Sequence, residues 1–279
     1  MAKKTSPKKG SRTGNAASGF AAELPPSLHA ERRGEIAILR LARPEKRNAL
    51  DDVLILGMER FFTTLPDDIK AVVLHGDGAH FSAGLDLSSL AEASVAEGVQ
   101  HSRMWHQAFN RIEFGKVPVV AVLHGAVVGG GLELAAAAHI RVAESSTYYA
   151  LPEGTRGIFL GGGGTVRLPR LIGTSRVMDM MLTGRTMSAE EGQQIGLSQY
   201  LVKPKAGLAK AIELARQIAT NAPMTNFAIM HVLPRIAESD PASGYIAEAL
   251  MAAVAQGSDE AKSRLKDFLE KRGKKVLHK

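Results

Sequence analysis

Residues 117–139 constrain the fold more than any other part of the chain, because they join an apolar run, three consecutive glycines and an Ala-rich stretch. The β-branched run at residues 117–123 predicts a buried strand. The glycines at residues 129–131 let the backbone approach another group closely, and an Ala-rich helix should follow them. Glu133 would then lie in the first turn of that helix, beside backbone N–H groups that lack partners within it.

A helix start of this kind has two interpretations. The unpaired N–H groups, at the positive end of the helix dipole, can hold a developing oxyanion, and the carboxylate of Glu133 can move a proton. Alternatively, the segment is a tight turn between a strand and a helix, with a solvated glutamate that the dipole favours. The segment alone does not decide between them.

Two further segments favour the first interpretation. The sequence FSAGLD at residues 81–86 follows an apolar strand predicted at residues 71–74, so small residues again place N–H groups at a strand end. A Pro-Glu-Gly sequence places Glu153 twenty residues beyond Glu133, and a glycine-rich stretch follows at residues 161–173. The alternation of predicted strands and helices indicates α/β architecture.

Capping residues and glycines predict further elements. Ser188 and Glu191 have the spacing of a capping box, and Gly196 can end the short helix that they begin. From residue 206 onward the pattern is helical. The other predicted elements are a strand at residues 35–41, a helix capped by Asp51 or Asp52 that runs to about residue 62, a helix over about residues 97–112, and a final amphipathic helix at residues 258–272.

The composition is that of a globular chain. Its 279 residues can build one large core, and no run of about twenty apolar residues predicts a transmembrane helix. Cysteine is absent, which excludes disulfides, thiol nucleophiles and cysteine metal sites and fits a reducing compartment. We therefore expect a cytoplasmic protein.

The positive charge is concentrated at the start of the chain. The formal net charge is +7, and five positive charges precede the first acidic residue, which leaves +2 for the remainder; they belong to Lys3, Lys4, Lys8, Lys9 and Arg12. The Ser, Pro, Gly and Ala between them predict a disordered tail. A solvated extension is the expected role, and a tail that binds an anionic partner is the alternative.

Six motifs, taken in order, resemble the crotonase or enoyl-CoA hydratase/isomerase superfamily over roughly residues 28–271. They are RPEKRNAL at residues 43–50, FSAGLD at 81–86, HGAVVGGGLELA at 124–135, LPEG at 151–154, GGGGTVRLPRLIG at 161–173 and LTGRTMSAEEGQQIGL at 182–197. The resemblance implies an α/β spiral of repeated ββα units with a C-terminal helical segment that mediates trimerisation. The implied divisions are a basic tail (1–27), the spiral core (28–205) and the helical segment (206–279).

The resemblance also implies a reaction centre. The backbone N–H groups of Leu85 and Gly130 would form an oxyanion hole for a thioester, and Gly161 would help to position a water. Glu133 would activate that water toward Cβ, while Glu153 would exchange a proton with Cα. Two carboxyls in one cleft should raise the pKa of at least one of them. The chain departs from typical hydratases at Leu85, where they carry alanine, and at Leu160, where they carry proline.

Binding residues follow from the same resemblance. Coenzyme A would contact residues from two loops and the last helix, namely Lys46, Arg47, Ala49, Ala83, Gly84, Asp86, Phe268 and Lys271. The last two often come from a neighbouring subunit in this superfamily, and Asp86 could instead cap a helix. The acyl pocket would contain Trp105, His106 and Phe109. His106 aligns with the active-site histidine of related dehalogenases, although a surface histidine and an aromatic core are the alternatives.

We therefore expect a lyase that adds water reversibly to a trans-2-enoyl-CoA and yields a 3-hydroxyacyl-CoA. No metal or redox cofactor is implied, and a homotrimer or a hexamer built from two trimers is expected. One alternative is an enoyl-CoA isomerase in which Glu153 alone shuttles a proton. The other is a non-catalytic protein of the same fold that binds nucleic acid through its tail, in which case affinity should fall with salt and with removal of residues 1–14.

Overall fold

The computed structural model describes residues 24–89, 94–270 and 272, so most of the predicted basic tail lies outside the described residues. A six-stranded sheet forms the base of the fold, in the order β1-β2-β3-β4-β6-β9. Its first two strands form an antiparallel hairpin, and every later neighbouring pair is parallel. The strands are β1 (Leu28–Arg33), β2 (Ile36–Leu41), β3 (Ala71–Gly76), β4 (Val119–Leu123), β6 (Ile140–Glu144) and β9 (Tyr200–Val202).

A second sheet runs beside the first and carries the segments that form the site. It contains β5 (Ala126–Val128), β7 (Tyr148–Ala150) and β8 (Thr186–Ser188), in that order. The chain passes from β4 to β5 through Gly125, where φ is +53° and a Cβ atom would lie 2.0 Å from the carbonyl oxygen of Ala79. Only glycine permits that turn. An isolated bridge between Ser82 and Val127 continues this sheet toward the FSAGLD segment.

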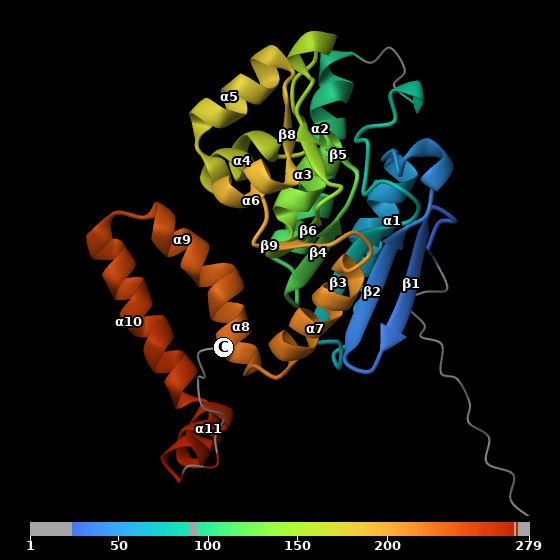
Figure 1. The fold of residues 1–279 in the computed structure, drawn as a ribbon. Coiled ribbons are helices and arrows are strands. Elements are labelled where there is room, and N and C mark those ends of the chain that lie inside the picture. The colour runs from blue at the N-terminus through green and yellow to red at the C-terminus, as the bar shows by residue number, and fades with distance from the viewer. Residues whose placement is uncertain (1–23, 90–93, 271, 273–279) are drawn as a thin grey trace, which may run out of the picture.

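Helices follow these strand pairs and complete the expected ββα units. β4 and β5 lead into α3 (Gly130–Ala137), which Figure 1 labels, and β6 and β7 precede α4 (Gly164–Ile172) along the chain. The mixed α/β fold with a helical C-terminal region confirms the predicted fold class. The other α-helices described before residue 200 are α1 (Asp52–Thr63), α2 (Val95–Glu113), α5 (Thr174–Thr183) and α6 (Ala189–Ile195). The same stretch contains the short 3-10 turns η1 (Pro44–Lys46), η2 (Leu87–Ser89) and η3 (Gly154–Arg156).

The predicted capping residues begin these helices. The side chain of Asp51 accepts a hydrogen bond from the N–H of Leu54 at the start of α1. Ser188 and Glu191 form the predicted capping box of α6, which ends at Gly196 in a left-handed conformation. A capping box that was not predicted, Ser94 with Glu97, begins α2.

Two apolar clusters stabilise this arrangement. The larger one fills the space between the sheets and the helices that cover them, and includes Phe61, Phe81, Phe109 and Tyr149. The smaller one lies beneath α7 (Gly207–Ala219), which packs on β3 and β4. Because the central strands β3 and β4 are buried on both faces, they appear in the sequence as almost unbroken apolar runs.

Beyond α7 the chain extends away from the two sheets (Figure 1). This part contains α8 (Pro223–Phe227), a π-helical turn (Ala228–Val232), α9 (Leu233–Glu238), α10 (Pro241–Gly257) and α11 (Asp259–Leu269). Large apolar side chains on it remain exposed, among them Tyr245 and Leu250. Among the helices of the described ranges, none is long and apolar enough to span a membrane.

Candidate active site

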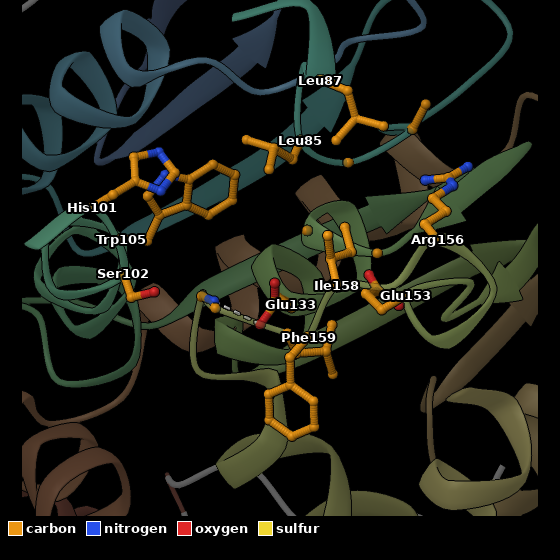
Figure 2. Close-up of a pocket in the computed structure, with 17 residues that line it drawn as sticks. Leu85, Leu87, His101, Ser102, Trp105, Glu133, Glu153, Arg156, Ile158 and Phe159 are labelled. Carbon is orange, nitrogen blue, oxygen red and sulfur yellow. Dashed lines mark hydrogen bonds between the residues drawn. The ribbon is translucent and has the colours of Figure 1, made fainter. Parts of the chain in front are cut away.

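A cavity of about 210 Å³ opens where the FSAGLD segment, α2, the start of α3 and the loop around η3 meet (Figure 2). Its wall is mainly apolar, but several polar side chains face it. The residues that line it are Ala83, Gly84, Leu85, Leu87, His101, Ser102, Trp105, Gly129, Gly130, Glu133, Glu153, Arg156, Ile158, Phe159, Leu160, Gly161 and Gly162. The structure therefore brings together the five residues to which the resemblance assigned a reaction centre, namely Leu85, Gly130, Glu133, Glu153 and Gly161.

Glu133 lies in the first turn of α3, as the sequence predicts, and its side chain is almost completely buried. Its Oε1 atom accepts hydrogen bonds from the N–H groups of Gly162 and Gly164, each at 2.8 Å. Burial raises the pKa of Glu133 to about 7, although the two N–H donors oppose this shift. The carboxyl group is therefore fixed in orientation and can exchange a proton near neutral pH.

Glu153 faces the same cavity from the η3 side (Figure 2). It is also buried, but its Oε2 atom has no hydrogen-bond partner within the described part of the chain. Burial raises the pKa of Glu153, and the nearby positive charge of Arg156 lowers it by a smaller amount. Of the two carboxyl groups, that of Glu133 is anchored by two N–H groups, whereas that of Glu153 has one oxygen atom without a partner among the described residues.

The main-chain N–H groups of Leu85 and Gly130 lie next to each other at the cavity wall. A Cβ atom on Gly130 would lie 3.3 Å from the nitrogen of Leu85. At Gly84, φ is +89° and a Cβ atom would lie 2.6 Å from the carbonyl oxygen of Val128, so glycine is needed for the two segments to approach. Across residues 24–89 and 94–270, neither N–H group donates to another protein atom.

The RPEKRNAL segment supports the loop that contains Leu85. The fully buried side chain of Asn48 donates to the carbonyl oxygens of Asp77 (2.9 Å) and His80 (2.7 Å). Arg43 forms an ion pair with Asp86 (3.0 Å) and another with the helix-capping Asp51 (2.6 Å). Sequence reasoning missed these supporting roles of Arg43 and Asn48, because their partners lie up to 43 residues away.

Asp86 caps the turn that follows it, which was the alternative role considered for this residue. Its carboxylate accepts from the N–H of Ser88 and so caps the turn η2. Hydrogen bonds from the Ser88 hydroxyl and from Arg43 hold the pKa of Asp86 at about 2. The Nζ atom of Lys46 lies 3.7 Å from the same carboxylate.

The remaining residues predicted to bind coenzyme A fall into two groups. Lys46, Arg47, Ala49, Ala83 and Gly84 belong to the adjoining loops near the cavity, where the side chains of Lys46 and Arg47 are exposed. Phe268 lies on α11, far from the cavity within one chain, and its side chain is 59% exposed (Figure 1). Lys271 lies outside the described residues.

The acyl-pocket prediction is corrected on α2. Trp105 lines the cavity, whereas Phe109 is fully buried behind it, with 5.6 Å between the ring centroids. His106 is exposed and borders a different surface hollow with Asn110 and Arg167. A helix turns about 100° per residue, which moves His106 away from the direction of Trp105 and towards this second hollow.

The cavity face of α2 consists instead of His101, Ser102 and Trp105. The helical spacing of His101 and Trp105 was the signal that could have identified this face. Ile158 and Phe159 also line the cavity, and the ring of Phe159 points away from the two glutamates (Figure 2). No group of three or more potential metal ligands (His, Cys, Asp or Glu) occurs among the residues that the structure describes.

Comparisons with known proteins agree over nearly the whole chain. A model of the enoyl-CoA hydratase/isomerase family matches residues 31–276. The short-chain-enoyl-CoA hydratase of Clostridium acetobutylicum is 31% identical over 245 residues, which cover 87% of this chain and 94% of that protein. The 2,3-dehydroadipyl-CoA hydratase of Escherichia coli is 31% identical over 251 residues, which cover 88% of this chain and 96% of that protein.

Solved structures have the same fold. A crystal structure from Rhodopseudomonas palustris, named provisionally as an enoyl-CoA hydratase, is 55% identical and superposes with a TM-score of 0.87. The match covers 89% of this chain and 97% of that one.

Proposed function

The chain belongs to the enoyl-CoA hydratase/isomerase family, an enzyme family that acts on acyl-CoA thioesters, and we propose that it adds water reversibly to a trans-2-enoyl-CoA. The observation that carries this proposal is the presence of two buried glutamates with different surroundings in one cavity, next to two N–H groups that have no acceptor among the residues the structure describes. Hydration needs one group that takes a proton from the water, one group that gives a proton to Cα, and hydrogen-bond donors that stabilise the enolate oxygen.

In the proposed mechanism, the thioester oxygen accepts hydrogen bonds from the N–H groups of Leu85 and Gly130. Glu133, held by Gly162 and Gly164, takes a proton from water as the water oxygen bonds to Cβ. The electrons of the double bond move toward the thioester oxygen, where the N–H groups stabilise the developing negative charge. Glu153 then donates its proton to Cα, which completes the addition of one water.

The raised pKa values favour this division of roles. With its pKa at about 7, Glu133 is substantially ionised at neutral pH yet basic enough to remove a proton. The pKa of Glu153 is raised mainly by burial, which favours the protonated form that donates. Gly161, near the hydroxyl of Ser102, would help to position the water.

Substrate binding is proposed for the residues predicted from the sequence. Coenzyme A would lie along the loops that carry Lys46, Arg47, Ala49, Ala83, Gly84 and Asp86. We propose that the exposed helices beyond α7 associate in a trimer or a hexamer, in which Phe268 and Lys271 of a neighbouring copy reach this ligand. The exposed apolar side chains on those helices support association.

An isomerase is the second candidate, with Glu153 moving a proton between two carbons. The hydrogen-bonded and buried state of Glu133 favours hydration, because isomerisation would leave this oriented carboxyl group without a role. A binding protein that uses its basic tail would lack any need for the two buried carboxyl groups.

The two reactions can be separated by their products. We would incubate the protein with crotonyl-CoA and, separately, with a 3-enoyl-CoA, and analyse the products by mass and by NMR. Hydration adds the mass of one water to crotonyl-CoA, whereas isomerisation changes only the double-bond position. Conversion of the 3-enoyl-CoA alone, with no water added to crotonyl-CoA or to longer 2-enoyl-CoAs, would replace the hydratase proposal with the isomerase.

A further inference from the structure

Arg167 is a buried cation behind the active-site wall, and the reaction described above does not use it directly. It lies on α4, and its side chain is only 6% exposed. Its Nε atom donates to Glu113 (2.6 Å) and its Nη2 atom to Asn110 (2.7 Å), both on α2. Its Nη1 atom donates to the carbonyl oxygen of Gly162 (3.1 Å).

The segment that Arg167 contacts is the one that holds Glu133. Gly162 uses its carbonyl oxygen for Arg167 and its N–H for the Oε1 atom of Glu133. Gly164 supplies the second N–H to the same oxygen. We call residues 162–164 the carboxylate loop. One peptide segment therefore connects the guanidinium group to the carboxyl group that is proposed to activate water.

Gly163 makes this contact possible. It has a φ of +93°, and a Cβ atom there would lie 2.4 Å from the Nη1 atom of Arg167. The guanidinium group therefore lies directly against the backbone of the carboxylate loop, with no side chain between them. A planar cation with several N–H groups can bind the loop and α2 together, which an ammonium group cannot do in the same geometry.

We propose that Arg167 is a positioning residue, which fixes the carboxylate loop against α2 and thereby orients Glu133. This inference rests on the proposed function of Glu133. Because α2 also carries Ser102 and Trp105 on the cavity wall, the same contacts set the position of Glu133 relative to that wall. Glu113 and Asn110 act as the anchor on α2.

The charge of Arg167 has a second effect on Glu133. Burial and the charge of Glu153 raise the pKa of Glu133, whereas Arg167 and the N–H groups of Gly162 and Gly164 lower it. Among the described residues, the other charged or titratable side chains near this part of the cavity are His101 and Arg156, and those around the hollow beside Gly163 are His106, Glu113 and Arg170. Removing the charge of Arg167 should therefore raise the pKa of Glu133, whereas retaining it as lysine should preserve more of the wild-type value.

The test compares Arg167→Gln, Arg167→Lys and a matched control, Arg170→Gln. Arg170 lies on the same helix, one turn further along, where it forms an exposed ion pair with Glu238, and within the described part of the chain its side chain donates no hydrogen bond to the carboxylate loop. For each variant we would measure the melting temperature, kcat and KM for crotonyl-CoA hydration, and the pH dependence of kcat. Glu113→Gln serves as a milder variant, because it keeps Arg167 in place and weakens only its anchor.

We expect Arg167→Gln to lower kcat by about tenfold to hundredfold with little change in KM, because a displaced base costs transition-state stabilisation. The acidic limb of its pH profile should move to higher pH, since ionised Glu133 is the active form. Arg167→Lys should also lower kcat, but its acidic limb should lie closer to that of the wild type. Arg170→Gln should have the kcat and the pH profile of the wild type. The proposal would be overturned by a folded Arg167→Gln protein whose kcat is within twofold of the wild-type value and whose acidic limb lies within about 0.3 pH units of the wild-type limb, roughly the precision of such profiles.

A titration independent of activity separates this proposal from the hydratase assignment. The ionisation of Glu133 can be followed by carboxyl NMR, with its signal assigned by its loss in Glu133→Gln. If the wild type hydrates no 2-enoyl-CoA, the proposed function fails, but a higher pKa of Glu133 in Arg167→Gln would still support the structural coupling. An unchanged pKa and carboxyl signal in both Arg167 variants would contradict that coupling.

Discussion

Glu153 packs directly against Gly129: a Cβ atom on Gly129 would lie 2.7 Å from the Oε1 atom of Glu153. Gly129 also has a φ of +52°, and its N–H donates to the carbonyl oxygen of Ala150 at 2.9 Å. The start of α3 and the carboxyl group on the opposite wall therefore share a contact that only glycine permits. The position of Glu153 depends on the backbone that also supplies the N–H of Gly130.

Gly129→Ala should displace the carboxyl group of Glu153 and lower kcat by about tenfold to hundredfold. Gly157→Ala is the control for adding a Cβ atom at a positive φ: its αL backbone (φ +69°, ψ 21°) imposes less strain than that of Gly129 (φ +52°, ψ −123°), and a Cβ atom there would meet nothing within 4 Å. Both variants should lose roughly 1–3 kcal/mol of stability from that strain. Steady-state kinetics at a temperature where both are folded would test this, and equal kcat losses would contradict the proposed contact.

Replacing Glu133 with glutamine should stabilise the protein at alkaline pH. Burial raises the pKa of Glu133 to about 7, so the wild type is favoured while this group is protonated and loses stability as pH rises through that value. Glutamine stays neutral and can keep the hydrogen bonds from Gly162 and Gly164. The melting temperatures of Glu133→Gln and wild type should be similar at pH 5 and should diverge at pH 8, by an amount equivalent to at most about 3 kcal/mol.

Glu248→Gln, on the exposed face of α10, controls for the loss of one negative charge. It should show no comparable divergence between pH 5 and pH 8. If Glu133→Gln were less stable than wild type at pH 8, the buried carboxyl group would not have the raised pKa that the mechanism needs.

Asn48→Ala should weaken the loop that carries Leu85. The substitution removes two hydrogen bonds to buried carbonyl groups and places alanine at a φ of +53°, so we expect a loss of about 2–4 kcal/mol. Activity should fall as well, since the N–H of Leu85 would no longer be held beside that of Gly130. Denaturant unfolding together with kcat measures both effects. Full kcat in a destabilised protein would show that Asn48 supports only the fold.

Leu85→Ala should widen the cavity without removing the backbone N–H. Leu85 is partly exposed to the cavity beside Trp105, so a smaller side chain should favour bulky acyl groups. We expect the ratio of kcat/KM for cinnamoyl-CoA over crotonyl-CoA to rise by about tenfold, within the range that a few methyl groups in a pocket provide. An unchanged ratio would indicate that the acyl group does not contact this side chain.

The sequence predicts those features that depend on local pattern. The strands predicted at residues 71–74 and 117–123 occur at residues 71–76 and 119–123, and the caps at Asp51 and Ser188 and the position of Glu133 in the first helical turn occur as predicted. Each depends on apolar periodicity or on a capping side chain within a few residues.

Other features depend on contacts between distant segments, which no local pattern contains. Arg167 meets Glu113 across 54 residues, and Arg43 meets Asp86 across 43. The error at His106 has a different origin, because an aligned position does not fix the rotation of a helix about its axis. Trp105 lines the cavity, whereas His106 borders a different hollow.

The central claim, that two glutamates divide the work of hydration, is tested most directly by following the absorbance of the conjugated thioester in crotonyl-CoA. Wild type, Glu133→Gln and Glu153→Gln would be compared at equal concentrations of folded protein. We predict rapid loss of absorbance with wild type and a decrease in kcat of at least about 100-fold with either variant, since each removes one proton-transfer group. Hydration at the wild-type rate by either variant would contradict the two-glutamate mechanism.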